Sequence, residues 1–232
     1  MKKMLALALF MGALGCSMPV SAAGKLSVEQ ENFYVLQSYS VYGYTYAKVA
    51  NVGDKPIKIN TGLLEIFDAN GDALTSTDYY SSYAEYLQPN EYTYVRMYDE
   101  VEDVEASEID DYMLTVTGKA DTDAYSYRFP CTTSYEPNVE DNYWTYNYMY
   151  ATFTNDTEET VYDISVVLAL LDAEGNILYM SSEELYSDIG VMPGSSITIR
   201  KDVDSSFIEY YEKNGLVPAS VDAIAYVNVE QN

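Results

Sequence analysis

The stretch YGYTYAKVAN, residues 42–51, returns 104 residues later as YNYMYATFTN, residues 146–155. Three tyrosines, an alanine and an asparagine stand at the same places in both stretches. The correspondence runs without a gap as far as Arg96 and Arg200, with 12 identities in 55 aligned pairs that include Asn, Asp, Gly, Pro and Arg in register. Since the repeat spans about 100 residues, the size of one ordinary domain, the sequence predicts a duplicated module.

Each copy alternates in the manner of β-strands. From residue 41 to residue 49, Val, Gly, Thr, Ala and Val alternate with Tyr, Tyr, Tyr and Lys, and a period of two in β-branched and aromatic residues is typical of a strand. Turn signals, such as Asn70-Gly71 and the prolines at 89 and 193, recur about every ten residues. This pattern predicts an all-β chain of two tandem antiparallel β-sandwiches of immunoglobulin-like architecture, with an up-and-down barrel as the alternative.

The predicted repeats occupy residues 24–120 and 121–232. Only after the strand that ends near Arg200 does the register slip, because the second copy has a longer segment, 205–217, in its place. Phe207, Ile208 and Tyr211, followed by Gly215, predict a short helix in this segment of the second copy.

The first residues have the pattern of an export signal. Lys2 and Lys3 precede an apolar stretch at 4–15 that is too short to span a bilayer, and small residues follow at 20–23. We predict a signal peptide over residues 1–23 and a secreted, extracellular protein. The alternative is a cell-surface lipoprotein lipidated at Cys16. No later segment reaches the roughly 18 uninterrupted apolar residues of a membrane helix, so no transmembrane segment is expected.

Composition narrows the function classes. The chain has 37 Asp and Glu against 12 Lys and Arg, a net charge of −25, so its surface repels nucleic acid and anionic lipid, and attracts cations or a basic partner. It has no His, which removes Ser-His-Asp and Cys-His nucleophiles and His metal ligands, and it has no glycine-rich phosphate loop.

The acidic residues are too numerous to define a catalytic pair, although a hydrolase with two converging carboxylates remains a hypothesis. We therefore predict a protein that is not an enzyme, with no catalytic residue and no cofactor. Cys131 is the one cysteine outside the leader, so no intrachain disulfide is expected, and we interpret its thiol as buried or inert.

Two acidic turns raise the question of a metal. Asp68, Asn70 and Asp72 offer oxygen ligands at alternate positions, which suits calcium, and 172–176 is the matching stretch of the second copy. Gly71, however, is the fourth residue of this stretch, where a hairpin turn needs it, whereas an EF-hand loop has its glycine at the sixth position. We favour a structural turn, and a weak calcium site is the alternative.

The residues of each copy resemble the FxLYD domain, a small exported bacterial β-sandwich. The resemblance rests on the Asn-x-Gly-Asp-Lys-Pro turn at 51–56, the Leu-Glu-Ile-Phe-Asp stretch at 64–68, its counterpart at 168–172, the glycine hairpin and the proline-centred turn. Leu replaces the leading Phe of the family motif in both copies, and its Tyr becomes Phe67 or Leu171. The resemblance implies the sandwich fold and export. It implies no activity, ligand or functional residue.

Tyrosine is the most unusual part of the composition, with 26 residues. If Ala47, Val49, Ala151 and Phe153 point inward, alternation sends two rows of tyrosines to the opposite faces. These rows are Tyr42, Tyr44 and Tyr46 in the first copy, and Tyr146, Tyr148 and Tyr150 in the second.

Exposed tyrosines suit a contact surface, because they offer a large area and a polar tip at a low entropy cost. The rings could instead stabilise their own sheets through cross-strand pairs. We predict a non-enzymatic extracellular or cell-surface interaction module that uses these rows or the loops to bind a protein or a glycan. A structural spacer or lipid-anchored stalk unit without a ligand is the alternative.

Overall fold

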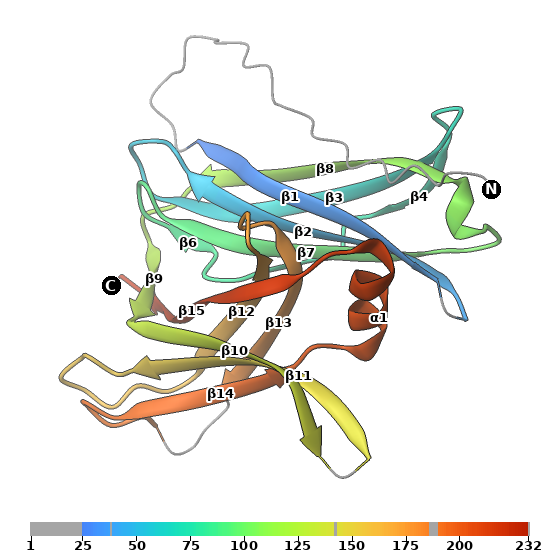
Figure 1. The fold of residues 1–232 in the computed structure, drawn as a ribbon. Helices are drawn as coiled ribbons and strands as arrows, with labels where there is room; N and C mark the ends of the chain where they lie inside the picture. The colour runs from blue at the N-terminus through green and yellow to red at the C-terminus, as the bar shows by residue number, and fades with distance from the viewer. Residues whose placement is uncertain (1–24, 38, 142, 186–189, 232) are drawn as a thin grey trace.

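A computed structural model describes residues 25–37, 39–141, 143–185 and 190–231 of the chain (Figure 1). Within these ranges strands form most of the fold, and every strand pairing is antiparallel. The elements of the first half are β1 (Leu26–Gln37), β2 (Val41–Asn51), β3 (Ile57–Asp68), β4 (Ala73–Thr77), β5 (Tyr80–Ser82), β6 (Tyr86–Leu87), β7 (Tyr92–Val101), the 3-10 helix η1 (Ala106–Glu108) and β8 (Ile109–Ala120). Those of the second half are β9 (Ala124–Phe129), β10 (Cys131–Asp141), β11 (Trp144–Thr154), β12 (Ile164–Asp172), β13 (Ile177–Leu185), β14 (Ser196–Asp202), α1 (Ser205–Asn214) and β15 (Pro218–Glu230).

The strands form two pairs of sheets. In the first half, the sheet β1-β2-β7-β5 packs on a sheet in which β3 has β8 on one side and β4 and β6 on the other. In the second half, the sheet β10-β11-β14 packs on the sheet β13-β12-β15-β9. The predicted fold class, two antiparallel β-sandwiches with a helix in the second, is therefore confirmed. The predicted boundary after residue 120 lies between β8 and β9.

The duplication extends to single hydrogen bonds. Ala47 lies opposite Val95 in the first sandwich, and their counterparts Ala151 and Ile199 lie opposite each other in the second. The Asn51 Nδ2 donates to the carbonyls of residues 55 and 87 at 2.8 and 3.0 Å, and its backbone N–H and C=O are also bonded across the sheet. Asn155 makes the same set of bonds 104 residues later. Each of these two buried side chains fixes a turn and the neighbouring strand together.

Each sandwich has its own apolar interior. In the first, Ala47 and Val95 on one sheet pack against Ile59, Leu64 and Ile66 on the other, and all five are at most 1% exposed. In the second, the corresponding interior holds apolar residues of β11, β12, β14 and β15, which include Met149, Phe153, Val166, Leu168, Leu170, Ile199 and Ala225. This second cluster continues beyond its own sandwich into tyrosines of the first, so the two sandwiches share a buried boundary.

The helix α1 begins and ends where its flanking residues predict. The Asp204 side chain accepts a 2.8 Å hydrogen bond from the backbone N–H of Ser206 at the N-terminus. Gly215 closes the helix with a φ of 70°, a left-handed conformation that favours glycine, and its N–H bonds to the carbonyl of Tyr211. The buried face of α1 carries Phe207 and Tyr211. The helix thereby lies between the second sandwich and β1 and β2 of the first (Figure 1).

Candidate functional site: the two tyrosine rows

The first tyrosine row lies on the outer face of the sheet β1-β2-β7-β5, on the side opposite Ala47. The second sandwich covers this face. Tyr46 is 1% exposed, and its ring lies 6.1 Å from the ring of Phe207 on α1 and 6.4 Å from that of Tyr179 on β13. Tyr44 is half-buried, and the centroid of its ring lies 5.1 Å from that of Phe207 in a T-shaped arrangement.

The prediction that this row is exposed is therefore wrong for Tyr46. Alternation correctly placed the tyrosines on the face opposite the core, but it could not show that another part of the same chain packs there. Tyr42, at the end of the row, stays partly exposed and donates a 3.0 Å hydrogen bond to Glu100 Oε2. The first row is thus for the most part an internal contact surface between the sandwiches.

Polar bonds hold the same boundary at β1. Asn32 Nδ2 and the Tyr34 hydroxyl both donate to the carbonyl of Ile177, at 2.8 and 2.7 Å, and Gln30 Nε2 donates to the carbonyl of Gly175 at 2.8 Å. The three donors stand at alternate positions of β1, so they share its outer face. Their acceptors belong to the turn before β13 and to its first residue, which explains why this hairpin of the second sandwich stays in place against β1.

A second polar group lies at β7. The hydroxyls of Tyr92 and Tyr94 donate to one oxygen of Asp222 on β15, at 2.7 and 2.6 Å. Burial, followed by the neighbouring Asp222 carboxylate, raises the pKa of both phenols well above the ordinary value of 10.0. Beside them Arg128 Nε lies 3.7 Å from Glu91, and burial lowers the pKa of this guanidinium.

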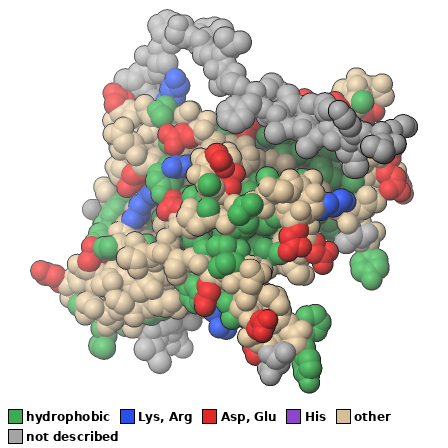
Figure 2. All heavy atoms as spheres, in the orientation of Figure 1, with side chains coloured by type: hydrophobic (Ala, Val, Ile, Leu, Met, Phe, Trp, Pro, Cys, Tyr) green, Lys and Arg blue, Asp and Glu red, His purple; other side chains and the backbone are tan. Residues whose placement is uncertain are grey.

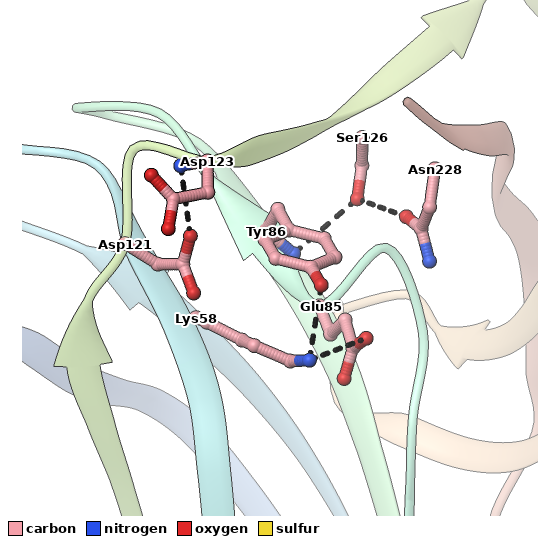
Figure 3. A network of polar contacts seen from close by, with 7 residues as sticks. All are labelled: Lys58, Glu85, Tyr86, Asp121, Asp123, Ser126 and Asn228. Carbon is pink, nitrogen blue, oxygen red and sulfur yellow. Dashed lines mark hydrogen bonds and ion pairs between the residues drawn. The ribbon is translucent and has the colours of Figure 1, made fainter. Parts of the chain in front are cut away.

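A polar network with one hydrogen bond between the sandwiches lies where the chain passes from one to the other (Figure 3). The Ser126 hydroxyl on β9 donates to Asn228 Oδ1 at 2.7 Å and accepts from the backbone N–H of Tyr86 at 3.3 Å. Lys58 on β3 donates to the Tyr86 hydroxyl at 3.0 Å and pairs with Glu85 at 3.4 Å. The boundary is consequently hydrogen-bonded from β1 to β9.

The second tyrosine row lies on the outer face of the sheet β10-β11-β14, which holds the counterparts of β1, β2 and β7. Tyr148 is 9% exposed, because the ring of Tyr146 stacks on it at 5.5 Å and the Arg200 guanidinium lies 4.5 Å from its ring centroid. Tyr150 approaches it edge-on at 6.2 Å and donates to Glu136 at 2.9 Å. The prediction of exposure is therefore wrong for Tyr148 as well, although here its neighbours in the same sheet cover it.

This face is otherwise open to solvent. Ser134 and Glu136 on β10, and Thr198, Arg200 and Asp202 on β14, are all exposed. Within the described residues no other sheet covers this face as the second sandwich covers the first row. The two rows occupy equivalent places in the fold but have different surroundings.

The structure adds Trp144 to the second row. It stands two residues before Tyr146 on β11, so it shares the outer face, and it is 71% exposed. The preceding Tyr143 is 95% exposed. The alternation W-T-Y-N-Y-M-Y over 144–150 places Trp144 on the same face as the tyrosines. The two repeats do not share this residue, because the counterpart of Trp144 is Ser40.

The acidic turn serves the hairpin. Asp68 Oδ1 accepts the backbone N–H groups of Asn70 and Asp72, both at 2.9 Å, and its Oδ2 accepts Asn70 Nδ2 at 3.0 Å. These bonds, with that from Asp72 foremost, lower the pKa of the Asp68 carboxyl. Gly71 closes the turn with a φ of 82°. Within the described ranges no group of three or more His, Cys, Asp or Glu residues is placed to hold a metal ion.

The remaining predicted residues fall in two places. Cys131 at the start of β10 is half-buried, and burial raises the pKa of its thiol, which lowers the fraction of reactive thiolate. Cys16 and the predicted leader lie outside the described residues. Among the residues that the structure describes, no helix combines the length and the hydropathy that a membrane span requires.

Comparison with known proteins gives no relative: a scan against protein-family models and a search of curated proteins both found no match. The resemblance to the FxLYD domain therefore stays a prediction.

Proposed function

We propose that the chain is an exported, non-enzymatic interaction module whose contact surface is the outer face of β10-β11-β14. This surface, the second-row face, consists of Trp144, Tyr146, Tyr148, Tyr150, Glu136 and Arg200. Export rests on the pattern of residues 1–23, and the absence of His supports a function without catalysis by a His-activated nucleophile.

The observation that carries the proposal is the use of the equivalent face in the first sandwich. There Tyr44 and Tyr46 pack against Phe207 of α1, in a contact between the two sandwiches of the same chain. Their counterparts Tyr148 and Tyr150 keep the same places in the sheet, where Tyr148 is covered only by neighbours of its own sheet, Tyr146 and Arg200, and no second sandwich packs on the face in the described part of the chain. A face that already serves as a protein contact in one copy is the best-supported contact surface in the other.

The composition of this face suits a protein partner. Trp, Tyr and Arg are the residues that most often dominate binding energy at protein interfaces. The tyrosines are already ordered, since Tyr146 and Tyr148 stack with an interplanar angle of 13°, so less side-chain entropy is lost on binding. Because Tyr146 stacks on Tyr148 and Arg200 lies over its ring, Tyr148 is 9% exposed and little of it is left for a sugar ring. We therefore favour a protein over a glycan.

The spacer alternative fits the packing of the sandwiches less well. A spacer gains length when its modules are joined end to end, whereas here the outer face of one sheet is buried against the other sandwich, with hydrogen bonds from Asn32, Tyr34, Tyr92 and Tyr94 across the boundary. This arrangement shortens the protein and leaves the second-row face open. It supports a binding function for the second sandwich, with the first as its packing partner.

The test is a pull-down from surface extracts with the mature protein and two variants. Trp144→Ser removes the most exposed aromatic ring of the face, and Tyr79→Ser removes an aromatic ring of similar exposure, 64%, from the first sandwich. We expect Trp144→Ser to lose the captured partner and Tyr79→Ser to keep it. Equal capture by both variants, or a partner lost equally by both, would contradict the assignment of the face.

A further inference from the structure

We infer that the opposite face of the β10–β11 hairpin forms a second site, a cavity that binds a peptide segment in which an apolar side chain is flanked by Lys or Arg. The cavity lies between this hairpin and α1 and has a volume of about 470 Å³. It is independent of the second-row face, because it is lined by Tyr135 and Asn147, whose side chains point to the other side of the sheet from Tyr146 and Tyr148.

The cavity combines an apolar wall with few polar groups, as binding sites for side chains usually do. Ile208 on α1, and Leu216 and Val217 after it, form the apolar wall. Val217 is 70% exposed, which is a high value for a valine and leaves its methyl groups available to a ligand. Tyr211, 1% exposed, forms part of the floor.

A β-bulge forms part of the cavity wall, since Asn138 lines the cavity. The pairing of β10 with β11 shifts between Glu136 and Val139, and Asn138 in the bulge has a φ of 57°. A bulge bends its strand, and here it lies beside the cavity in the part of the hairpin that faces α1. The bulge is fixed by Asn147, 8% exposed, whose Oδ1 accepts the Asn138 N–H at 3.3 Å and the Tyr135 hydroxyl at 3.1 Å.

Because these bonds are made within the chain, the cavity is preformed. A ligand then does not have to supply the free energy that would order the wall. The site can consequently hold a short segment that has no stable fold of its own.

The charge around the cavity selects the partner. Glu212 on α1 lines it, and Glu140 lies across from Thr145 on the same face of the hairpin as Asn147. The chain as a whole carries a net charge of −25, and Figure 2 shows acidic side chains beside hydrophobic ones near the end of the hairpin. An acidic or neutral segment is repelled or gains nothing here, whereas Lys or Arg on either side of an apolar anchor pairs with the rim.

The equivalent place in the first sandwich shows what the second has gained. A cavity of about 490 Å³ lies there between the β1–β2 hairpin and the segment after β7, and its wall includes Glu100, Glu102, Asp103, Glu105 and Glu108. The wall of the first cavity also contains Val41, Val101 and Val104, but these are buried or half-buried. The second sandwich has α1, Leu216 and the exposed Val217 at this place, so its cavity offers the more accessible apolar wall. We therefore place the apolar side chain of the peptide in the cavity of the second sandwich.

The test uses a labelled peptide, acetyl-KLKFKLK-amide, in fluorescence anisotropy with the full mature chain at 50 and 500 mM NaCl. Acetyl-ELEFELE-amide and acetyl-SLSFSLS-amide serve as charge controls. Ala219→Phe fills the cavity from an exposed position of its wall, and Ala73→Phe makes the same change at an exposed position of β4 in the first sandwich. Val217→Ser removes the exposed methyl groups without filling the cavity.

We expect saturable binding of the basic peptide that weakens at the higher salt, and at least about tenfold weaker binding of the two control peptides. Ala219→Phe should weaken binding by at least about tenfold and Ala73→Phe by less than about twofold, at unchanged melting temperature. If Ala219→Phe does not fold, weaker binding of the basic peptide by Val217→Ser supports the cavity as the binding site. The proposal would be overturned by any of three results. These are the absence of saturable binding, equal binding of the acidic and the basic peptide, and binding by both cavity variants that equals that of the wild type. Loss of the peptide with Trp144→Ser alone would instead assign it to the second-row face.

Discussion

The hydroxyl of Tyr34 donates a 2.7 Å hydrogen bond to the carbonyl of Ile177, 143 residues further along the chain. Tyr34 belongs to the first sandwich and Ile177 to the second, and Tyr34 is 6% exposed. A bond between strands so far apart in sequence, made in a buried place, forms only when both sandwiches are folded and packed together. The tyrosines that the sequence sets apart therefore take part in the assembly of the chain itself.

We expect Tyr34→Phe to reduce the free energy of unfolding by about 0.5–1.5 kcal/mol. The ring still fills its place, and the loss is that of one buried hydrogen bond, since Asn32 continues to donate to Ile177. Urea denaturation followed by circular dichroism measures the change. Tyr42→Phe is the control, because its hydroxyl bonds to Glu100 at an exposed position and its loss should cost close to nothing. Equal losses for the two variants would contradict a buried boundary.

Phe207→Ala should be the most damaging single change at the boundary. Phe207 is 4% exposed and packs on Tyr44, Tyr46 and Tyr179, so its removal leaves a cavity that costs about 3–5 kcal/mol. Urea denaturation measures it, and Glu209→Ala, at an exposed position of the same helix, should change stability by less than about 0.5 kcal/mol. A small effect of Phe207→Ala would mean that α1 does not hold the sandwiches together.

These contacts also show where sequence reasoning stops. Alternation and the repeat predicted the fold class, the helix and the side of the sheet on which the tyrosines lie, because periodicity of two and turn residues are local properties. The residues that cover this side of the sheet are distant in sequence. Tyr46 is buried by Tyr179 and Phe207, which lie 133 and 161 positions further along the chain. The two long strands β1 and β10 were not predicted, because neither has a regular apolar alternation.

Asn51 and Asn155 make the same bonds in the two copies, so substituting each shows whether the two sandwiches depend equally on these bonds for their free energy of unfolding. Asn51→Ala and Asn155→Ala each remove two hydrogen bonds from the Asn Nδ2 to backbone carbonyls, at 2.8–3.0 Å. We expect each to cost about 1–3 kcal/mol, and the two values to agree within about 1 kcal/mol. Asn60→Ala, at an exposed position of β3, is the control. A large loss in one copy alone would show that only one sandwich depends on this turn.

We expect the protein to lose stability in alkali because of Tyr92 and Tyr94. The pKa values of Tyr92 and Tyr94 are raised well above 10.0 in the folded protein, so the folded state keeps protons that the unfolded state releases. Their stabilisation is complete below about pH 10 and is lost as the pH rises above it. The melting temperature should fall from about pH 10 upward, and the double variant Tyr92→Phe/Tyr94→Phe should show a shallower fall. An unchanged slope in the double variant would place the alkaline sensitivity elsewhere.

The fluorescence of Trp144 reports directly on the second-row face, because Trp144 is the single tryptophan of the chain and is 71% exposed. In the free protein its emission should lie at the wavelength typical of solvated indole, and acrylamide should quench it almost as well in the folded protein as in urea. Binding of a partner to the second-row face removes water from the indole, so the emission should shift to shorter wavelength and acrylamide quenching should fall. The basic peptide in the cavity leaves the indole exposed, because the cavity lies on the other face of the hairpin. A Trp144 that is already shielded from acrylamide in the free protein would mean that the face is covered, and the second sandwich would then need a different contact surface.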